Sequence, residues 1–371
     1  MDPAPLPSTT LREPLSVPLA REICSAFDLH GPVDGDKAPL RAGCGFSGAR
    51  VYRWTDETGD TWAWRSFSDQ TAEDIRIGQI ARWAACWRDA GLPIAVFRPV
   101  ASRDSRRIGG APQYLFRPLH RPLEAWLVEP WLPGTADYSS DPSPERLDDT
   151  MRSLARLHLA TDGTSSVQMP GRFAPAGLLR RCSSYGERYW AGTALGSQIT
   201  RIPATLRPIA EAFQEIAEKV GPAIMRDAEA ACRLTVPAVV CIRDLWHDHL
   251  LFTGHRLTGL IDLHSADRDC VASDLTRLLG SLHPFSPGRW MDAISIYEQV
   301  RPLEPEERLL LRHYERTSVL LSGIYWLTRW VERSRISPSI VAPHQVSREQ
   351  ARLSELLQRM IAPSPLDGLF P

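Results

Sequence analysis

The stretch VVCIRDLWHDHLLFTGHRLTGLID, residues 239–262, carries the strongest structural signal in the chain. Its first four residues are apolar and predict a buried strand, after which Asp244 follows closely. Two further apolar runs, 250–252 and 257–261, flank a glycine-containing turn and predict a hairpin. Because a tight turn joins the hairpin strands, we expect Asp244, before the first strand, to lie near Asp262, at the end of the second.

Two carboxylates at one end of a hairpin suit a general base and a metal ligand. Each aspartate also suits a solvated turn at a strand end, which is the alternative interpretation. The regular order of strand, aspartate, hairpin and aspartate favours a functional role over two unrelated turns.

The organisation of the chain changes at a Pro- and Gly-rich segment, 129–134. Before it, aromatic-rich alternating runs at 49–54 and 61–67 predict a hairpin, and residues 70–90 have helical periodicity. After it, helical patterns dominate. We therefore expect an α+β protein with three parts: a loose Pro-rich leader with one helix near 19–27 (residues 1–35), a small β-rich N-lobe (36–130) and a helical C-lobe (131–371).

The composition argues against several classes of protein. The 371 residues include 43 basic and 44 acidic side chains, so no charge dominates as a nucleic-acid or membrane-surface binder requires. The seven cysteines are scattered and form no C-x-x-C pair, which argues against a disulfide scaffold or zinc ribbon and favours the cytoplasm. The oligomeric state stays open.

The run 239–279 resembles the catalytic and metal-binding segments of aminoglycoside phosphotransferases, choline kinases and their relatives. That family has H-G-D-x-x-x-x-N, a hairpin, I-D-x, and then an aspartate that opens a helix. This chain has I-R-D-x-x-x-x-H at 242–249, L-I-D at 260–262 and S-D-L at 273–275. The resemblance implies a two-lobed protein-kinase-like fold, with a catalytic loop at 242–249 and a metal segment at 260–264.

The resemblance also implies a function, the ATP-dependent transfer of the γ-phosphoryl group to a hydroxyl of a small-molecule acceptor. Asp244 would be the catalytic base and Asp262 the principal metal ligand. Arg243 and Asp274 would support the catalytic loop, although Asp274 suits an ordinary helix cap equally well.

Nucleotide-binding residues follow from the same resemblance. The glycine-rich segment containing Gly45, Ser47 and Gly48 would cover the phosphates, and the backbone of Glu129 and Trp131 would contact adenine. A glycine-rich turn between strands is also common without any ligand.

The chain departs from the family at the phosphate-binding lysine. Lys37 and Lys219 are its only lysines, and neither falls on the third strand. Arg65 occupies that strand and would clamp phosphate instead, which is not a conservative change because guanidinium is longer and planar. The partner of Arg65 on the following helix stays open among Glu73, Asp74 and Gln79.

A second departure concerns the metal. His249 stands where the family has a metal-binding asparagine, and imidazole is a poorer ligand for Mg²⁺ than for Mn²⁺. We therefore expect Mg²⁺ or Mn²⁺, with His249 as an unusual second ligand.

Two other functions stay open. The missing lysine and asparagine are compatible with a catalytically inactive kinase-fold scaffold. If 247 and 249 share one face of a strand, His247, His249 and Asp262 would form the metal centre of a hydrolase. The acceptor is not identified, although the nearly balanced charge after residue 285 does not favour a polycation such as an aminoglycoside.

Overall fold

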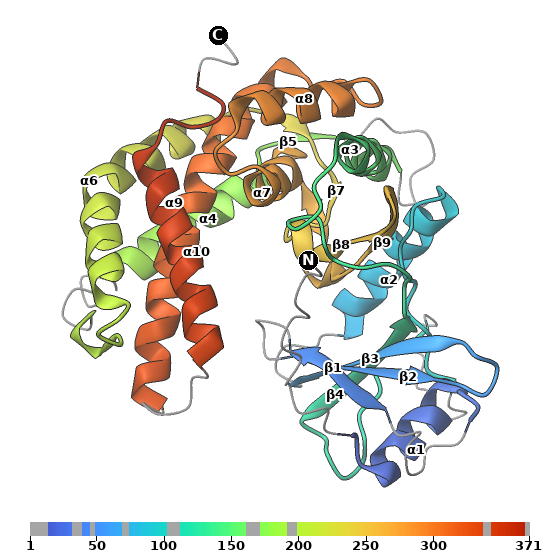
Figure 1. The fold of residues 1–371 in the computed structure, drawn as a ribbon. Helices are drawn as coiled ribbons and strands as arrows, with labels where there is room; N and C mark the ends of the chain where they lie inside the picture. Colours follow the sequence, from blue (N-terminus) through green and yellow to red (C-terminus); the bar gives the residue numbers. More distant parts are fainter. Residues whose placement is uncertain are drawn as a thin grey trace, which may run out of the picture. The chain divides into compact units, whose positions relative to one another are not determined.

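The chain divides into two units in the computed structural model, which describes residues 14–31, 39–44, 49–68, 74–101, 112–160, 171–190, 199–336 and 343–367. The first unit comprises residues 1–135 and 251–264, and the second comprises 136–250 and 265–371 (Figure 1).

The first unit is built on a four-stranded antiparallel sheet in the order β1 (Leu40–Cys44), β2 (Arg50–Thr55), β3 (Thr61–Ser68) and β4 (Glu124–Pro130). The predicted hairpin is therefore confirmed as β2 and β3. The Asp56 carboxylate closes its turn by accepting hydrogen bonds from the backbone of Thr58 and Asp60 and from the Trp62 indole. Short polar side chains that bond to nearby backbone favour such turns.

The helix predicted near residues 19–27 is observed as α1 (Val17–Phe27), but it is not part of a loose leader. Its Ile23 and Phe27 are fully buried and belong to one core cluster with the sheet residues Trp54 and Trp64. Burying such large apolar side chains contributes about 1.5–3 kcal/mol each. The leader prediction is therefore wrong for this segment, which is an integral layer of the first unit. The predicted helix at 70–90 is α2 (Asp74–Asp89).

The hairpin of β8 (Leu250–Thr253) and β9 (Arg256–Leu260) corrects the expected domain boundary, because it joins the first unit and not the helical one. Leu260 forms a parallel bridge with Ile94, and Phe252 pairs with Thr135. Gly134 permits this approach with a φ of 104°, because a Cβ there would lie 2.8 Å from the Phe252 carbonyl oxygen. The metal segment thus belongs with the β-rich unit.

The second unit is mostly helical. Two small antiparallel pairs accompany its helices, β5 (Arg172–Phe173) with β6 (Val236–Pro237) and β7 (Val239–Cys241) with β10 (Asp267–Asp269). The long helices are α3 (Pro144–Leu159), α4 (Ala176–Trp190), α6 (Arg207–Ala231), α7 (Ala272–Leu282), α8 (Pro287–Glu298), α9 (Pro305–Ile336) and α10 (Pro343–Ile361).

Helices α6, α9 and α10 pack against one another (Figure 1) and enclose a core that includes Phe213, Leu320, Leu327 and Leu356. These apolar positions recur at helical spacing, which explains why the sequence predicts helices here. Among the described residues, no helix combines the length and apolar character needed to cross a membrane.

The contact between α6 and α9 leads to a stability prediction. A Cβ on Gly323 would lie 1.8 Å from the ring of Phe213, which is fully buried and has no room to move. We expect Gly323→Ala to cost about 1–3 kcal/mol of unfolding free energy, as overpacking does in other cores. Denaturant unfolding measures this.

The matched control is Gly288→Ala in α8, where a Cβ would meet nothing within 4 Å. It should be neutral or slightly stabilising, because alanine is the better helix former. Equal unfolding midpoints for the two variants would show that α6 and α9 do not pack as described.

Candidate functional site

The loop 242–249, which is the expected catalytic loop, is held by a buried carboxylate. Asp274, on the first turn of α7, is fully buried and accepts hydrogen bonds from the backbone N–H groups of Ile242 at 2.7 Å and Arg243 at 2.5 Å. Val271, not Asp274, is the N-cap of α7. The alternative interpretation of Asp274 as an ordinary helix cap is therefore wrong.

His158, which lies in the last turn of α3, also contacts Asp274. The His158 Nε2 lies 3.1 Å from the Asp274 carboxylate, and its Nδ1 lies 2.8 Å from the hydroxyl of Tyr297. Both side chains of the His158–Asp274 pair are completely inaccessible. A buried carboxylate is stable only with such a full set of donors, so this network keeps the loop in one conformation.

The loop bends sharply at Arg243, whose φ is 68°. This left-handed conformation is uncommon for a residue other than glycine, and such strain often marks functional segments. The Arg243 guanidinium lies 3.2 Å from Asp267 and 3.7 Å from Asp269. Arg243 therefore connects the loop to β10 as well as to Asp274.

Asp244 follows the bend, and its side chain is 48% exposed. Arg277 holds one carboxylate oxygen, with its Nη2 at 2.8 Å and its Nε at 3.2 Å. Arg277 was not among the residues predicted from the sequence, although it follows Asp274 by three residues and so lies on the same side of the helix. The structure thus gives Asp244 an oriented carboxylate with one oxygen left for other contacts.

His249 does not occupy the position of a metal ligand. The Trp246 indole donates a hydrogen bond to His249 Nε2 at 2.7 Å, so His249 Nδ1 carries the proton and donates to the backbone carbonyl of Asp244 at 2.9 Å. Because a metal needs a free imidazole lone pair, the expectation that His249 is a second ligand is corrected. His249 instead fixes the backbone of Asp244.

The hydrolase alternative also fails on geometry. Residues His247–His249 form a 3₁₀-helical turn (η4) and not a strand, so the alternation that would put both imidazoles on one face is absent. Within the described ranges, one cluster brings three metal-ligating atoms close together: His158, Cys241 and Asp274. Its histidine and aspartate already form hydrogen bonds, and burial raises the pKa of Cys241 well above its usual range.

The first unit contains a second cluster of charged side chains, formed by Arg65, Glu129 and Asp262. Asp262 lies two residues beyond the end of β9, with a φ of 65° and a side chain that is 38% exposed. The Arg65 guanidinium donates to Glu129 at 2.6 Å and lies 3.9 Å from Asp262. Burial alone would lower the pKa of Arg65, but the neighbouring charges of Glu129 and Asp262 raise it above its ordinary value. Arg65 is therefore a fixed cation beside Asp262.

The partner of Arg65 is thus Glu129, a residue that was expected only to offer its backbone to adenine. Asp74 is paired with Arg117 at 2.9 Å, and Glu73 lies outside the described residues. Arg65 pairs with Leu127 across β3 and β4, so Glu129 is its diagonal neighbour on the same sheet face.

The remaining nucleotide-binding expectations are partly outside the described residues. Gly45, Ser47 and Gly48 all fall there. The backbone N–H of Trp131 donates to the carbonyl of Thr61 at 2.8 Å, so only the Trp131 carbonyl is left for a ligand.

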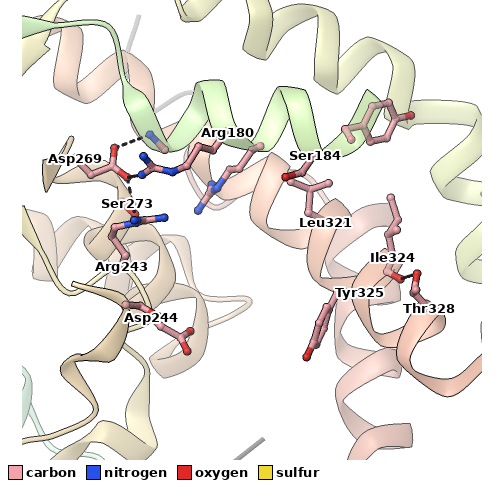
Figure 2. Close-up of a pocket in the computed structure, with 14 residues that line it drawn as sticks. Arg180, Ser184, Arg243, Asp244, Asp269, Ser273, Leu321, Ile324, Tyr325 and Thr328 are labelled. Carbon is pink, nitrogen blue, oxygen red and sulfur yellow. Dashed lines mark hydrogen bonds and ion pairs between the residues drawn. The ribbon is translucent and has the colours of Figure 1, made fainter. Parts of the chain in front are cut away.

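A cavity of about 440 Å³ opens in the second unit beside Asp244. Figure 2 shows Arg180, Arg243 and Asp269 on one side of it, with Asp244 beneath them, and residues of α9 on the facing side. This size suits a small molecule.

Solved structures of two small-molecule kinases share the fold of this chain. Spectinomycin phosphotransferase aligns over 94% of this chain and 99% of its own, with a TM-score of 0.59 and 11% identity. Amicoumacin kinase aligns over 95% and 96%, with a TM-score of 0.57 and 14% identity. The expected α+β kinase-like fold is confirmed.

Residues 40–310 match the phosphotransferase enzyme family, and the chain belongs to that family. Curated relatives include the homoserine kinases of Beijerinckia indica subsp. indica, 30% identical over 41% of this chain and 53% of the relative, and of Methylobacterium nodulans, 28% identical over 48% and 58%. The chain therefore spans only about half the length of the curated relatives it matches.

The Arg65–Glu129 pair leads to a second stability prediction. Glu129→Gln would leave the buried guanidinium of Arg65 with only the partly exposed Asp262, 3.9 Å away, as a counter-charge, so we expect a loss of about 3–5 kcal/mol of unfolding free energy. The matched control is Glu124→Gln on the same strand, whose partner Arg50 is partly exposed, and it should cost below about 1 kcal/mol. Chemical denaturation measures both losses. Similar losses of unfolding free energy in the two variants would contradict the buried pairing of Arg65 with Glu129.

The His158–Asp274 pair leads to a prediction about pH. Burial lowers the pKa of His158 below its ordinary value of 6.5, although Asp274 opposes this shift. The contribution of neutral His158 to the unfolding free energy is therefore complete above the pKa that His158 has in the unfolded chain. It is lost as the pH falls toward the lower pKa that His158 has in the folded protein. We expect the unfolding free energy to fall less steeply below pH ~6.5 in His158→Gln than in the wild type.

Urea unfolding at several pH values measures this slope, which does not depend on the absolute stability of the variant. His30→Gln, at an exposed histidine, should keep the wild-type slope. An unchanged slope in His158→Gln would mean that His158 is not buried in the neutral form.

Proposed function

We propose that this protein transfers the γ-phosphoryl group of ATP to a hydroxyl of a small molecule. The observation that carries the proposal is the placement of Asp244 at the edge of a cavity of small-molecule size. The loop of Asp244 has a strained backbone at Arg243 and is held by hydrogen bonds with Asp274 and His249. Family membership supports the same reaction class. The relatives named homoserine kinase support a small-molecule acceptor.

Asp244 acts as the general base in this proposal. Its carboxylate accepts the proton of the acceptor hydroxyl as that oxygen forms a bond to the γ-phosphorus and the bond to the ADP oxygen breaks. Arg277 holds one carboxylate oxygen, so the other is oriented for the incoming hydroxyl. Phosphoryl transfer depends mainly on positioning, which explains why so many contacts hold this loop.

The residues beside Asp262 fit a divalent ion and phosphates. A partly exposed carboxylate is a suitable oxygen ligand for Mg²⁺ or Mn²⁺, which neutralises phosphate charge when bound. Arg65, the proposed phosphate clamp, offers the charge that the family lysine would supply, and Glu129 restricts its orientation. The preference for Mn²⁺ inferred from His249 loses its basis, since both imidazole nitrogens are engaged.

The test is Asp244→Asn, with ADP release measured in the presence of a panel of hydroxyl compounds. We expect turnover to fall at least 10³-fold while ATP affinity stays within about threefold, because a base acts on the transition state and not on nucleotide binding. The control is Asp248→Asn in the same loop, a partly exposed carboxylate that lies 3.3 Å from His247 Nε2, and it should keep wild-type turnover.

Two results would contradict the proposal. Wild-type turnover in Asp244→Asn would remove the base. A wild-type protein that binds ATP but transfers phosphate to none of the compounds would favour the inactive scaffold.

A further inference from the structure

The cavity beside Asp244 has two chemically different walls (Figure 2). One wall carries Arg180 and Arg243, with Asp269 beside both. Arg181 also lines the cavity. The facing wall comes from α9 and combines apolar with hydroxyl side chains, including Leu321, Ile324, Tyr325 and Thr328. A ligand would therefore meet cations on one side and a mixed surface on the other.

Two of the three arginines are already paired with carboxylates. Asp269 is almost completely buried and lies 3.3 Å from Arg180 Nη2 and 3.7 Å from Arg243 Nε. The same carboxylate accepts hydrogen bonds from the backbone N–H of Gly177 and the hydroxyl of Tyr314. Asp269 therefore holds the arginine wall in place and has little capacity left for a cationic ligand.

Arg181 differs from its neighbours because it has no carboxylate partner among the residues that the structure describes. Its Nη1 donates to the carbonyl of Tyr314 at 2.7 Å and to the hydroxyl of Thr317 at 3.0 Å, and its guanidinium lies 4.7 Å from the Tyr314 ring centroid. These neutral contacts orient the guanidinium. Within the described chain, its Nε and Nη2 have no hydrogen-bond acceptor.

The surroundings of Arg181 disfavour its charged form. Burial lowers the pKa of Arg181, and the nearby cations Arg277 and Arg243 act in the same direction, only partly offset by Tyr314 and Asp269. Guanidinium nevertheless stays charged in proteins. A half-buried cation whose nearby carboxylate, here Asp269, is already paired with two other arginines is stabilised when an anion binds beside it.

We propose that the acceptor carries an anionic group, a carboxylate or a phosphate ester, which Arg181 binds while the acceptor hydroxyl reaches Asp244. This rests on the proposed function for the role of Asp244, but the anion site itself depends only on the arginine wall. A planar guanidinium binds either anion through paired hydrogen bonds. The same wall disfavours polycationic acceptors, because like charges repel in a poorly solvated cavity.

The test measures binding to the full chain by calorimetry, without nucleotide, so that it does not depend on turnover. Three matched pairs are compared: 4-hydroxybutyrate with 4-hydroxybutyramide, L-homoserine with its amide, and glycerol 3-phosphate with glycerol. Kanamycin is the cationic comparison. We expect at least one anion to bind at least tenfold more tightly than its uncharged counterpart. An advantage of the anion in the first two pairs would indicate a carboxylate site, and an advantage in the third pair would indicate a phosphate-ester site.

The variant that decides the role of the side chain is Arg181→Gln, which should abolish that tenfold advantage. Arg226→Gln, an exposed arginine on α6, should retain it. Arg181→Lys keeps the charge without the fork and should recover part of the advantage, which separates anion recognition from a folding defect.

Equal binding of charged and uncharged partners would overturn the inference, as would preferential binding of kanamycin or no binding by any of the three anions. Transfer to neutral hydroxyl compounds alone would leave the proposed function standing and contradict the anion site. Anion binding without phosphoryl transfer would support the anion site and contradict the proposed function.

Discussion

The buried carboxylate of Asp274 is the constraint on which the conformation of the proposed catalytic loop depends. It accepts two backbone N–H groups of the loop and pairs with His158, all without access to solvent. A charge in this position is tolerable only while every donor stays in place, so the loop has essentially one conformation. The left-handed turn at Arg243 is one consequence, and the exposed, oriented carboxylate of Asp244 is the other.

Arginine shapes the electrostatics of both units, because the chain has almost no lysine. Buried acids hold several of these guanidinium groups: Glu129 holds Arg65, and Asp269 lies beside Arg180 and Arg243. Each acid makes a cation rigid instead of merely neutralising it. Arg181 is the exception, since neutral groups orient it and its charge is left for a ligand.

The sequence predicted the hairpin of β2 and β3, the helices α1 and α2, and the hairpin of β8 and β9, because strand and helix periodicities are local. It did not predict the pairing of Arg65 with Glu129, which joins diagonal neighbours on strands 64 residues apart. The role of His249 was also missed, since it depends on a 3₁₀-helical turn that brings the Trp246 indole to its ring. Such contacts depend on tertiary packing, which periodicity does not encode.

The most direct test of a working kinase site is a thermal-shift titration with ATP, in Mg²⁺, in Mn²⁺ and without metal. A ligand at a hundred times its dissociation constant adds about 2.7 kcal/mol to the native state, which raises Tm by several degrees. The account predicts a metal-dependent shift in the wild type that is lost in Asp262→Asn and kept in Asp89→Asn, an exposed carboxylate of α2. No shift with either metal, or an equal shift in Asp262→Asn, would contradict it.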